Sequence, residues 1–239
     1  MKKVIITGAT SGIGYALAQK LLYEGYMVAA TGRRTDRLRP LKEISTDRLV
    51  IQHMDVSDTK RSRSQFNDLV TQLGSLDILV LNAGVGSTGE QDEWETQQTV
   101  IDVNIAGFAA LASAAYELFL KQGYGHLVGI SSIAGLFGYA SNPTYNASKA
   151  FVSTYLQGYR QRARRSSTDI TVTDIKPGFI HTEMTRHRTD MFWTATPETA
   201  ARQMVNIIEK KAHYGYVTHR WRMVAWLLGV LPQRLFDYV

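Results

Sequence analysis

Residues 7–14 read Thr-Gly-Ala-Thr-Ser-Gly-Ile-Gly, and this stretch decides the fold. It follows a short β-branched run and precedes apolar residues at helical spacing, so it predicts a turn between a strand and a helix. The glycines do not have the common Gly-x-Gly-x-x-Gly spacing. They still let backbone N–H groups approach a ligand closely, and the N-terminus of the following helix favours an anion. The turn therefore predicts a pyrophosphate site, with a plain tight turn and helix cap as the alternative.

Strand and helix patterns alternate along the rest of the chain. Amphipathic segments lie at residues 34–43 and 60–73, and a helix is expected to begin near Asn142. Repeated strand–helix units imply a parallel sheet that is covered on both faces. We therefore predict an α/β fold with a doubly wound, Rossmann-like parallel sheet in three layers, built as a single domain over residues 1–239. The expected strands are residues 3–7, 27–31, 48–53, 77–81, 127–131 and 170–175, with Val217 as a candidate for a last edge strand.

The composition excludes several classes of protein. The chain has no Cys, and its six His lack metal-ligand spacing, so disulfides are excluded and no metal is expected. The apolar run after Met1 stops at Thr7, far short of a signal peptide. The apolar residues 223–231 fall well below the roughly 20 that span a bilayer. We expect a cytoplasmic protein.

The chain carries a formal net charge of +6, which raises the question of a polyanionic partner. Its arginines form three small, scattered clusters, at residues 33–39, 160–165 and 220–222. Such clusters are more typical of solvated faces or of a cofactor phosphate than of a nucleic-acid interface. We expect no nucleic-acid partner, and a membrane or polyanion surface stays the alternative.

The end of the second expected strand indicates which dinucleotide binds. Proteins that prefer NAD usually carry an acid there, which binds the ribose 2′-OH. This chain has Gly32, followed by Arg33 and Arg34. A guanidinium matches a 2′-phosphate in charge and in geometry, so NADP(H) is favoured over NAD. The alternative is that both arginines are merely solvated.

Tyr145 and Lys149 are four residues apart in a helical segment, so both side chains project from one face. A free tyrosine titrates near pH 10, and a neighbouring ammonium lowers that pKa toward neutrality. Ser132 follows the strand ending at Ser131, where its hydroxyl could donate to a carbonyl oxygen as charge develops. Ser131 is the alternative for that role. A Tyr-x-x-x-Lys pair is common on surface helices, so the pair indicates an active site only together with other motifs of the chain.

From residue 3 to about residue 208 the chain resembles the short-chain dehydrogenase/reductase family. Residues 7–14 match its Thr-Gly-x-x-x-Gly-x-Gly turn, and residues 82–84 match its Asn-Ala-Gly motif. Residues 177–178, with Thr182 after them, match the segment that covers the nicotinamide. The matches at the catalytic positions are Asn104, Ser132, Tyr145 and Lys149.

The resemblance implies a role for each matching residue. Tyr145 would exchange the proton, Ser132 would hold the carbonyl, Lys149 would hold the nicotinamide ribose and tune Tyr145, and Asn104 would anchor a water relay. Asn82 is equally well explained as a tie between strands, and Asp55 as a helix cap. The expected cofactor contacts are Gly8, Ser11, Gly12, Ile13, Gly14, Arg33, Arg34, Asp55, Val56, Asn82, Ala83, Gly84, Tyr145, Lys149, Pro177, Gly178, Ile180 and Thr182.

Substrate specificity is expected between about residues 181 and 239, where members of the family differ. Met184, Met191, Phe192 and Trp193 could form an apolar lid, or simply pack a helix. The tail mixes Trp221, Trp226, Leu228 and Phe236 with arginines. We expect it to form a pocket wall or a subunit contact, and contact with a membrane surface is the less favoured alternative.

These patterns together predict an NADP(H)-dependent oxidoreductase. It would transfer a hydride between the nicotinamide and a small-molecule carbonyl or secondary alcohol, and the apolar tail favours a bulky apolar substrate. The family resemblance implies a homodimer or homotetramer that forms through residues 107–121 and 145–160. The alternative function is a non-catalytic NADP-binding sensor or scaffold on the same fold.

Overall fold

The computed structural model describes residues 1–86, 93–187, 189, 191–230 and 234. Its centre is a seven-stranded sheet in the order β3-β2-β1-β4-β5-β6-β7, in which every paired strand is parallel to its neighbour. The predicted parallel α/β sheet is therefore confirmed. The strands are β1 (Lys3–Thr7), β2 (Met27–Gly32), β3 (Leu49–His53), β4 (Ile78–Leu81), β5 (Tyr124–Ile130), β6 (Asp169–Pro177) and β7 (Tyr214–Val217).

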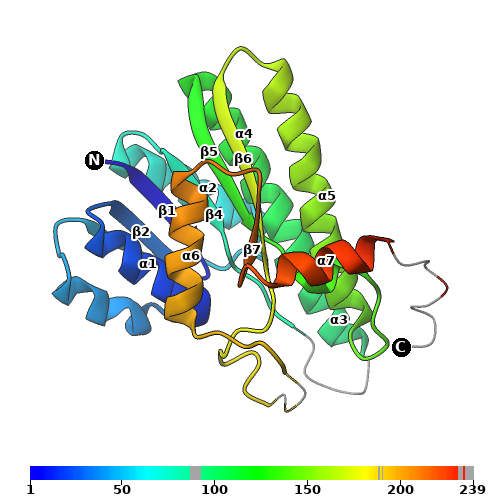
Figure 1. Cartoon of the computed structure of the whole chain (residues 1–239). Helices are drawn as coiled ribbons and strands as arrows, with labels where there is room; N and C mark the ends of the chain where they lie inside the picture. The colour runs from blue at the N-terminus through cyan, green and yellow to red at the C-terminus, as the bar shows by residue number, and fades with distance from the viewer. Residues whose placement is uncertain (87–92, 188, 190, 231–233, 235–239) are drawn as a thin grey trace.

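Helices cover both faces of the sheet, which gives the predicted three layers (Figure 1). The side chains of successive β1 residues point to opposite faces of the sheet. Val4 and Ile6 belong to the buried core on one face, and Ile5 belongs to the core on the other. The first core contains α1 and α6, and the second contains α2, α4 and α5. The α-helices are α1 (Gly12–Tyr23), α2 (Thr59–Leu73), α3 (Trp94–Ile101), α4 (Phe108–Gln122), α5 (Pro143–Arg165), α6 (Pro197–Glu209) and α7 (Trp221–Val230).

The described residues also form three short helical segments of other types. The expected amphipathic segment after β2 is a 3-10 helix, η1 (Thr35–Glu43), which contains Pro40. A π-helix, η2 (Asp102–Gly107), joins α3 to α4. A second 3-10 helix, η3 (Ile133–Leu136), follows β5. Sequence patterns predicted neither η2 nor η3.

The run from α3 through η2 to α4 is continuous, from Trp94 to Gln122. It is long and apolar enough to cross a membrane by length and composition alone, but 56% of its most apolar window is buried inside the protein. Phe108, Leu111 and Phe119 of this run belong to the core beneath the sheet. The run is thus packed as a core helix.

The strand order places the site. β1 pairs with β2 on one side and with β4 on the other, so the chain reverses its direction of winding next to β1. At such a point the loops after the carboxyl ends of neighbouring strands diverge and leave a crevice, where open α/β sheets bind ligands. The glycine turn after β1 opens into this crevice.

Candidate active site

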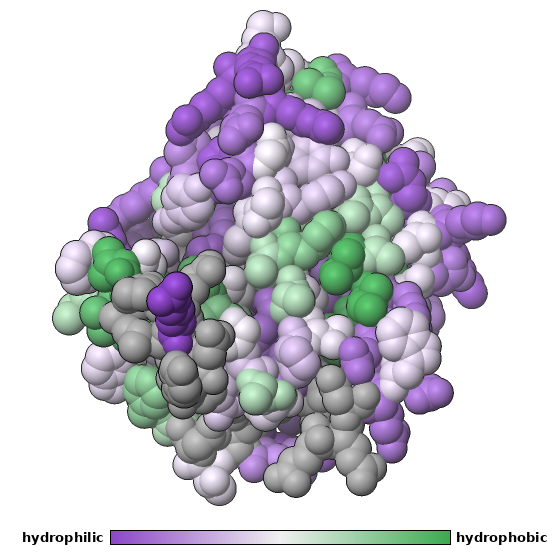
Figure 2. Space-filling view, turned by 90° about the vertical axis from the view of Figure 1, so that its right-hand side faces the viewer, coloured by the Kyte–Doolittle hydropathy of each residue, from purple (hydrophilic) through white to green (hydrophobic). Residues whose placement is uncertain are grey.

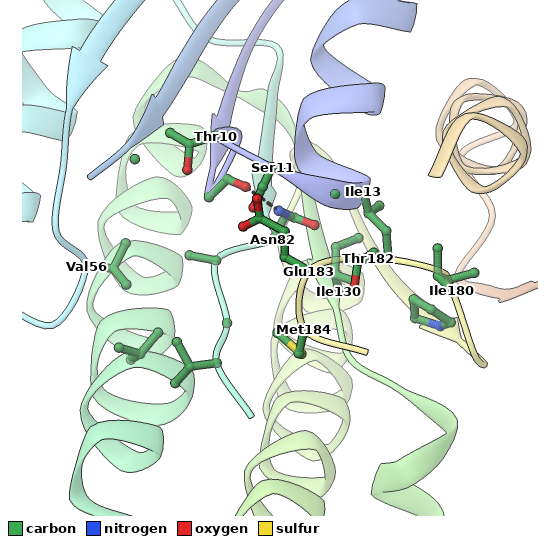
Figure 3. Close-up of a pocket in the computed structure, with 18 of the residues that line it drawn as sticks. Thr10, Ser11, Ile13, Val56, Asn82, Ile130, Ile180, Thr182, Glu183 and Met184 are labelled. Atoms are coloured by element: carbon green, nitrogen blue, oxygen red, sulfur yellow. Dashed lines mark hydrogen bonds between the residues drawn. The ribbon is translucent and has the colours of Figure 1, made fainter. Parts of the chain in front are cut away.

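A cavity lies at the carboxyl ends of β1, β2, β4, β5 and β6. Figure 3 shows its wall, in which the glycine turn and α1 meet the end of β4 and the segment after β6. Of the residues predicted to contact cofactor or substrate, only Gly14 and Asn104 lie outside the lining. The lining also includes Ser131, the alternative to Ser132, and Met184, one of the expected lid residues. The lining residues that the sequence did not indicate as contacts are Thr10, Gly32, Met54, Val85, Val103, Ile130, Glu183 and Thr185.

The glycine turn has room for a ligand but none for side chains. Gly8 and Gly12 have φ of +66° and +53°, which favour glycine. A Cβ on Gly8 would lie 2.6 Å from the Cα of Ala83. A Cβ on Gly14 would lie 2.3 Å from the carbonyl oxygen of Gly8, which explains why Gly14 stands behind the cavity wall rather than in it. The backbone that begins α1 therefore forms a cradle that fits a phosphate group.

Asn82 holds the turn in place. Its Nδ2 donates to the carbonyl oxygens of Thr7 and Gly8, at 3.2 and 2.9 Å. The Thr7 hydroxyl accepts hydrogen bonds of 3.1 Å from the backbone N–H groups of Asn82 and Ala83. Asn82 thus ties β4 to β1, as one of the two sequence explanations proposed, and it also lines the cavity.

Arg33 and Arg34 lie at the end of β2 and line the adjoining part of the cavity. Arg34 donates to the Ser11 hydroxyl of the glycine turn and pairs with Glu183, both at 3.0 Å. Arg37 forms a second ion pair with Glu183. Hydrogen bonds from Arg37, and then from Arg34, hold the pKa of Glu183 below its usual value.

Asp55 lines the same end of the cavity, where it accepts hydrogen bonds from the backbone N–H and the hydroxyl of Ser57, at 3.0 and 2.7 Å. The helix-cap explanation for Asp55 is wrong. The cap of α2 is Asp58, whose carboxylate accepts from the backbone N–H of Arg61 at 3.0 Å.

Tyr145 and Lys149 lie one turn apart on α5, and both line the cavity. The Lys149 Nζ is 5.7 Å from the centre of the Tyr145 ring and donates to the carbonyl oxygen of Ile130 at 3.0 Å. Burial lowers the pKa of Lys149 to about 8, and the nearby carboxylate of Asp174 opposes this shift. The ammonium is thus held beside the phenol ring by its own helix and by β5.

The contacts of the two serines after β5 differ. Ser132 caps the start of η3, where its hydroxyl accepts from the backbone N–H of Ala134 at 3.1 Å and lies 3.3 Å from the carbonyl oxygen of Pro177. Ser131 donates to the buried carboxylate of Asp174 and is 3.2 Å from the carbonyl oxygen of Ile175. Ser131 is therefore engaged by the strand behind it, which favours Ser132 as the donor to a substrate.

Asn104 lies in the π-helix η2, where it is buried and outside the cavity lining. Its side chain exchanges two hydrogen bonds of 2.9 Å with the backbone of Val85 and donates to the Ser148 hydroxyl at 3.0 Å. Asn104 therefore holds the loop after β4 against α5, beside the cavity. The water relay implied by the resemblance stays a prediction.

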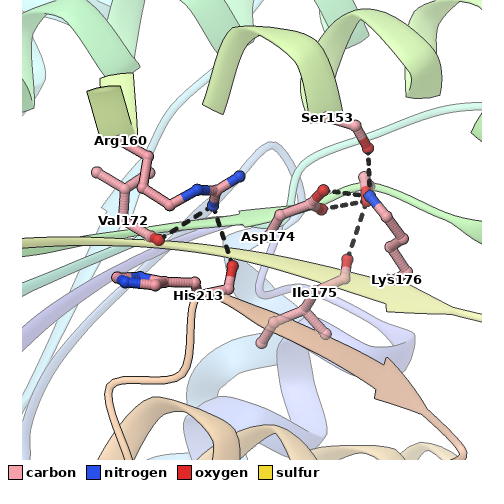
Figure 4. A network of polar contacts seen from close by, with 8 residues as sticks. Ser153, Arg160, Val172, Asp174, Ile175, Lys176 and His213 are labelled. Atoms are coloured by element: carbon pink, nitrogen blue, oxygen red, sulfur yellow. Dashed lines mark hydrogen bonds and ion pairs between the residues drawn. The ribbon is translucent and has the colours of Figure 1, made fainter. Parts of the chain in front are cut away.

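A buried polar network lies next to the cavity wall, and no sequence pattern predicted it. Figure 4 shows Asp174 and Lys176, two residues apart on β6, forming an ion pair that Ser153 of α5 joins. Their side chains are only 0% and 7% exposed. The Lys176 Nζ lies 2.6 Å from the Ser153 hydroxyl. Through Ser131, this network reaches the cavity wall.

Aromatic side chains gather after β6 and at the start of α7. Trp221 is buried, and its ring centre lies 5.6 Å from that of Phe179, 5.1 Å from that of Phe192 and 5.8 Å from that of Trp193. Met184 lines the cavity nearby. Of the four residues expected to form a lid, Met184 alone is part of the lining, and Phe192 and Trp193 pack on Trp221. Elsewhere in the expected specificity segment, α6 belongs to the core.

Metal-ligating side chains do not cluster in the described part of the chain. Among those residues, no group of three His, Asp or Glu could hold an ion. The groups present instead suit proton transfer at an organic carbonyl, with a phenol, an ammonium and a hydroxyl facing one cavity.

Comparisons with known proteins agree with this geometry. An uncharacterised oxidoreductase of Mycobacterium tuberculosis is 32% identical over 98% of this chain and 95% of its own. The NADP-dependent 3-hydroxy acid dehydrogenase of Escherichia coli is 34% identical over 74% of this chain and 72% of its own. The solved structure of a short-chain dehydrogenase from Sphingobium yanoikuyae in complex with NADPH has the same fold, with a TM-score of 0.82, 21% identity and coverage of 98% and 97%. The family model for short chain dehydrogenases matches residues 2–192, and the chain belongs to that family.

Proposed function

We propose that this oxidoreductase catalyses NADP(H)-dependent interconversion of a carbonyl compound and a secondary alcohol. The observation that carries the proposal is the convergence of Ser132, Tyr145 and Lys149 on the cavity into which the glycine turn opens. Bound NADPH supplies a hydride, and NADP⁺ accepts one. The protein has to bind and orient the substrate and move a proton.

Each of the three side chains has one task in reduction. The Tyr145 hydroxyl gives its proton to the carbonyl oxygen while the carbonyl carbon becomes an alcohol carbon. The Ser132 hydroxyl donates a hydrogen bond to the same oxygen as negative charge develops on it. The Lys149 ammonium stabilises the Tyr145 phenolate, which regains its proton from water. In oxidation the same phenolate accepts the proton of the alcohol.

Two observations support NADP(H) as the cofactor. Arg33 and Arg34 line the cavity where an acid would favour NAD, and a guanidinium suits a phosphate. The relative in E. coli that is 34% identical is an NADP-dependent enzyme. The cradle of the glycine turn fits the pyrophosphate that both dinucleotides share.

The cavity rim favours a substrate with an apolar part. Met184 and Gly178 line the cavity. Gly178 lies against Trp221, around which Phe179, Phe192 and Trp193 form the aromatic cluster. The E. coli relative acts on 3-hydroxy acids, so a panel of substrates has to include both polar and bulky apolar compounds.

The test is NADPH oxidation with ketones and aldehydes that range from 3-oxo acids to long-chain ketones. Tyr145→Phe is expected to lower kcat/KM by about 100-fold or more, because the proton donor is lost. Tyr23→Phe is the control, since Tyr23 is exposed at the end of α1 and lies outside the cavity lining. If Tyr145→Phe keeps wild-type turnover, the proton-transfer role is wrong. NADPH binding without turnover of any substrate would favour the sensor alternative.

We also propose a homodimer or homotetramer that forms through α4 and α5. Phe151 and Tyr155 of α5 are only partly buried within one chain, and their rings stack with centres 5.0 Å apart. Light scattering coupled to size-exclusion chromatography tests the assembly, and a monomer at micromolar concentration would exclude it.

A further inference from the structure

Helix α7 has two apolar faces, and only one of them is covered. Trp221 and Ala225 are buried against the body of the protein. On the other side, at the helical spacing i, i+3, i+4 and i+7, apolar side chains point to solvent. They are Met223, Trp226, Leu227 and Val230, which are 70%, 71%, 49% and 60% exposed, and we call them the α7 face. A soluble helix normally turns polar residues outward, so this face calls for a partner.

The α7 face is part of a wider apolar region. Helix α7 lies along the molecule, against η3 and β7, rather than projecting from it (Figure 1). Phe192 and Trp193, which precede α6 in the sequence, pack against Trp221 in the first turn of α7. Their side chains are 53% and 43% exposed. Figure 2 looks onto the side where α5 and α7 lie, and apolar side chains occupy its middle and left-hand edge, whereas hydrophilic ones gather at its top.

The charged residues of α7 and of the chain next to it in the sequence have one sign. No acidic residue occurs between Glu209 and Asp237 in the sequence. Within that stretch Arg220, Arg222 and Arg234 are all exposed. The Arg220 guanidinium lies 5.8 Å from the centre of the Trp193 ring. A partner that offers both an apolar layer and negative charge fits these side chains.

We propose that the α7 face docks on the surface of an anionic phospholipid bilayer. Tryptophan, leucine and valine would enter the boundary between headgroups and acyl chains, and the arginines would meet the phosphates. The helix has 10 residues, about 15 Å of rise, so it lies in the interface and does not span. This inference does not depend on the proposed reaction.

A second copy of the chain fits this surface less well. In a symmetric dimer the same patch meets itself, so each arginine would approach the arginines of the other copy. No acidic side chain lies on α7 to neutralise them. An anionic bilayer supplies that charge without the repulsion, and the surface attraction falls as salt is added.

The placement of α7 has a functional consequence. The helix packs against η3, whose first residue follows Ser132. A bilayer held at the α7 face would thus be separated by only one packed segment from Ser132, a residue of the cavity lining.

Vesicle flotation with the full-length protein tests the proposal. We expect the wild type to float with vesicles that contain phosphatidylglycerol, to float weakly with pure phosphatidylcholine, and to dissociate as salt is raised. Replacing Trp226 and Leu227 with Ser is expected to lower the bound-to-free ratio by about tenfold or more. Arg222→Gln is expected to reduce both binding and its salt dependence.

Tyr23→Ser is the matched control, because Tyr23 is a 67% exposed aromatic at the end of α1, away from α7 (Figure 1). It should float as the wild type does. Circular dichroism checks that each variant is folded, and the comparison of the two vesicle types needs no variant at all. Equal flotation with both vesicle types, or none at low salt, overturns the proposal. So does an oligomer that the Trp226 and Leu227 substitutions dissociate while no vesicle binds.

Discussion

At the scale of single residues, the reaction depends on the charge of Lys149. Its folded-state pKa of about 8 lies below the ordinary value of 10.5, so the ammonium loses its proton as the pH rises through about 8. Reduction needs that ammonium beside Tyr145. We expect kcat/KM for carbonyl reduction to fall on the alkaline side of about pH 8, measured with saturating NADPH. A rate that stays level there would contradict this role of Lys149.

Asp174→Asn tests the network behind the site. The carboxylate raises the pKa of Lys149, so its loss should move the alkaline fall in activity to lower pH. It also leaves Lys176 buried without its partner, which should cost about 3–5 kcal/mol of stability in urea unfolding. Asp169→Asn is the control on the same strand, because Asp169 is exposed and pairs with Lys211. An unmoved pH profile in folded Asp174→Asn would exclude the coupling.

Arg34→Ala tests the choice of cofactor. Loss of a charged hydrogen bond to the 2′-phosphate should raise the KM for NADPH by about 10- to 100-fold, with little change for NADH. Arg37→Ala serves as the comparison, because Arg37 also pairs with Glu183 but lies outside the cavity lining. If both cofactors respond equally to Arg34→Ala, the assignment fails.

At the scale of elements, the glycine turn depends on close backbone contacts. In Gly14→Ala the new Cβ would lie 2.3 Å from the Gly8 carbonyl and 2.4 Å from Asn82 Nδ2, so the backbone must shift. We expect a loss of about 1–3 kcal/mol in stability and weaker NADPH binding by titration. Gly158→Ala in α5 meets nothing within 4 Å and should stabilise the helix by about 1 kcal/mol. Wild-type NADPH affinity in Gly14→Ala would contradict the cradle.

The elements could be predicted because their signals are local. The run from Lys3 to Thr7 and the turn after it carry their pattern within a dozen residues, and the predicted edge strand at Val217 is present as β7. The predicted β5 began at Leu127, but the strand starts at Tyr124, because residues 124–126 have no apolar pattern and still pair with β6. The π-helix has no sequence signature that these patterns detect.

Contacts between distant residues could not be predicted from the sequence. The Arg34–Glu183 pair spans 149 residues, and the Ser131–Asp174 hydrogen bond spans 43. In the sequence, a charged residue such as Asp174 within a buried strand is seen only as an interruption of an apolar run. Its partner is known only once the strand order is known. The motif residues around the cavity were identifiable because the family resemblance, and not periodicity, marks them.

At the scale of the whole molecule, cofactor binding should raise the free energy of unfolding. A ligand at about 100 times its Kd stabilises a protein by about 2.7 kcal/mol. For a chain of this size that corresponds to a rise in Tm of about 5–10 °C. We expect NADPH to produce this rise in a thermal melt and NADH, at equal concentration, a smaller one. Equal shifts would argue against selection for the 2′-phosphate.

The π-helix joins two helices into a single rod from Trp94 to Gln122. Each residue added to or removed from such a rod turns everything beyond it by about 100°. Shortening η2 by one residue would swing the buried side of α4, with Phe108 and Leu111, away from the sheet. Homologous chains should therefore tolerate changes of side chain in this segment far better than a change in its length.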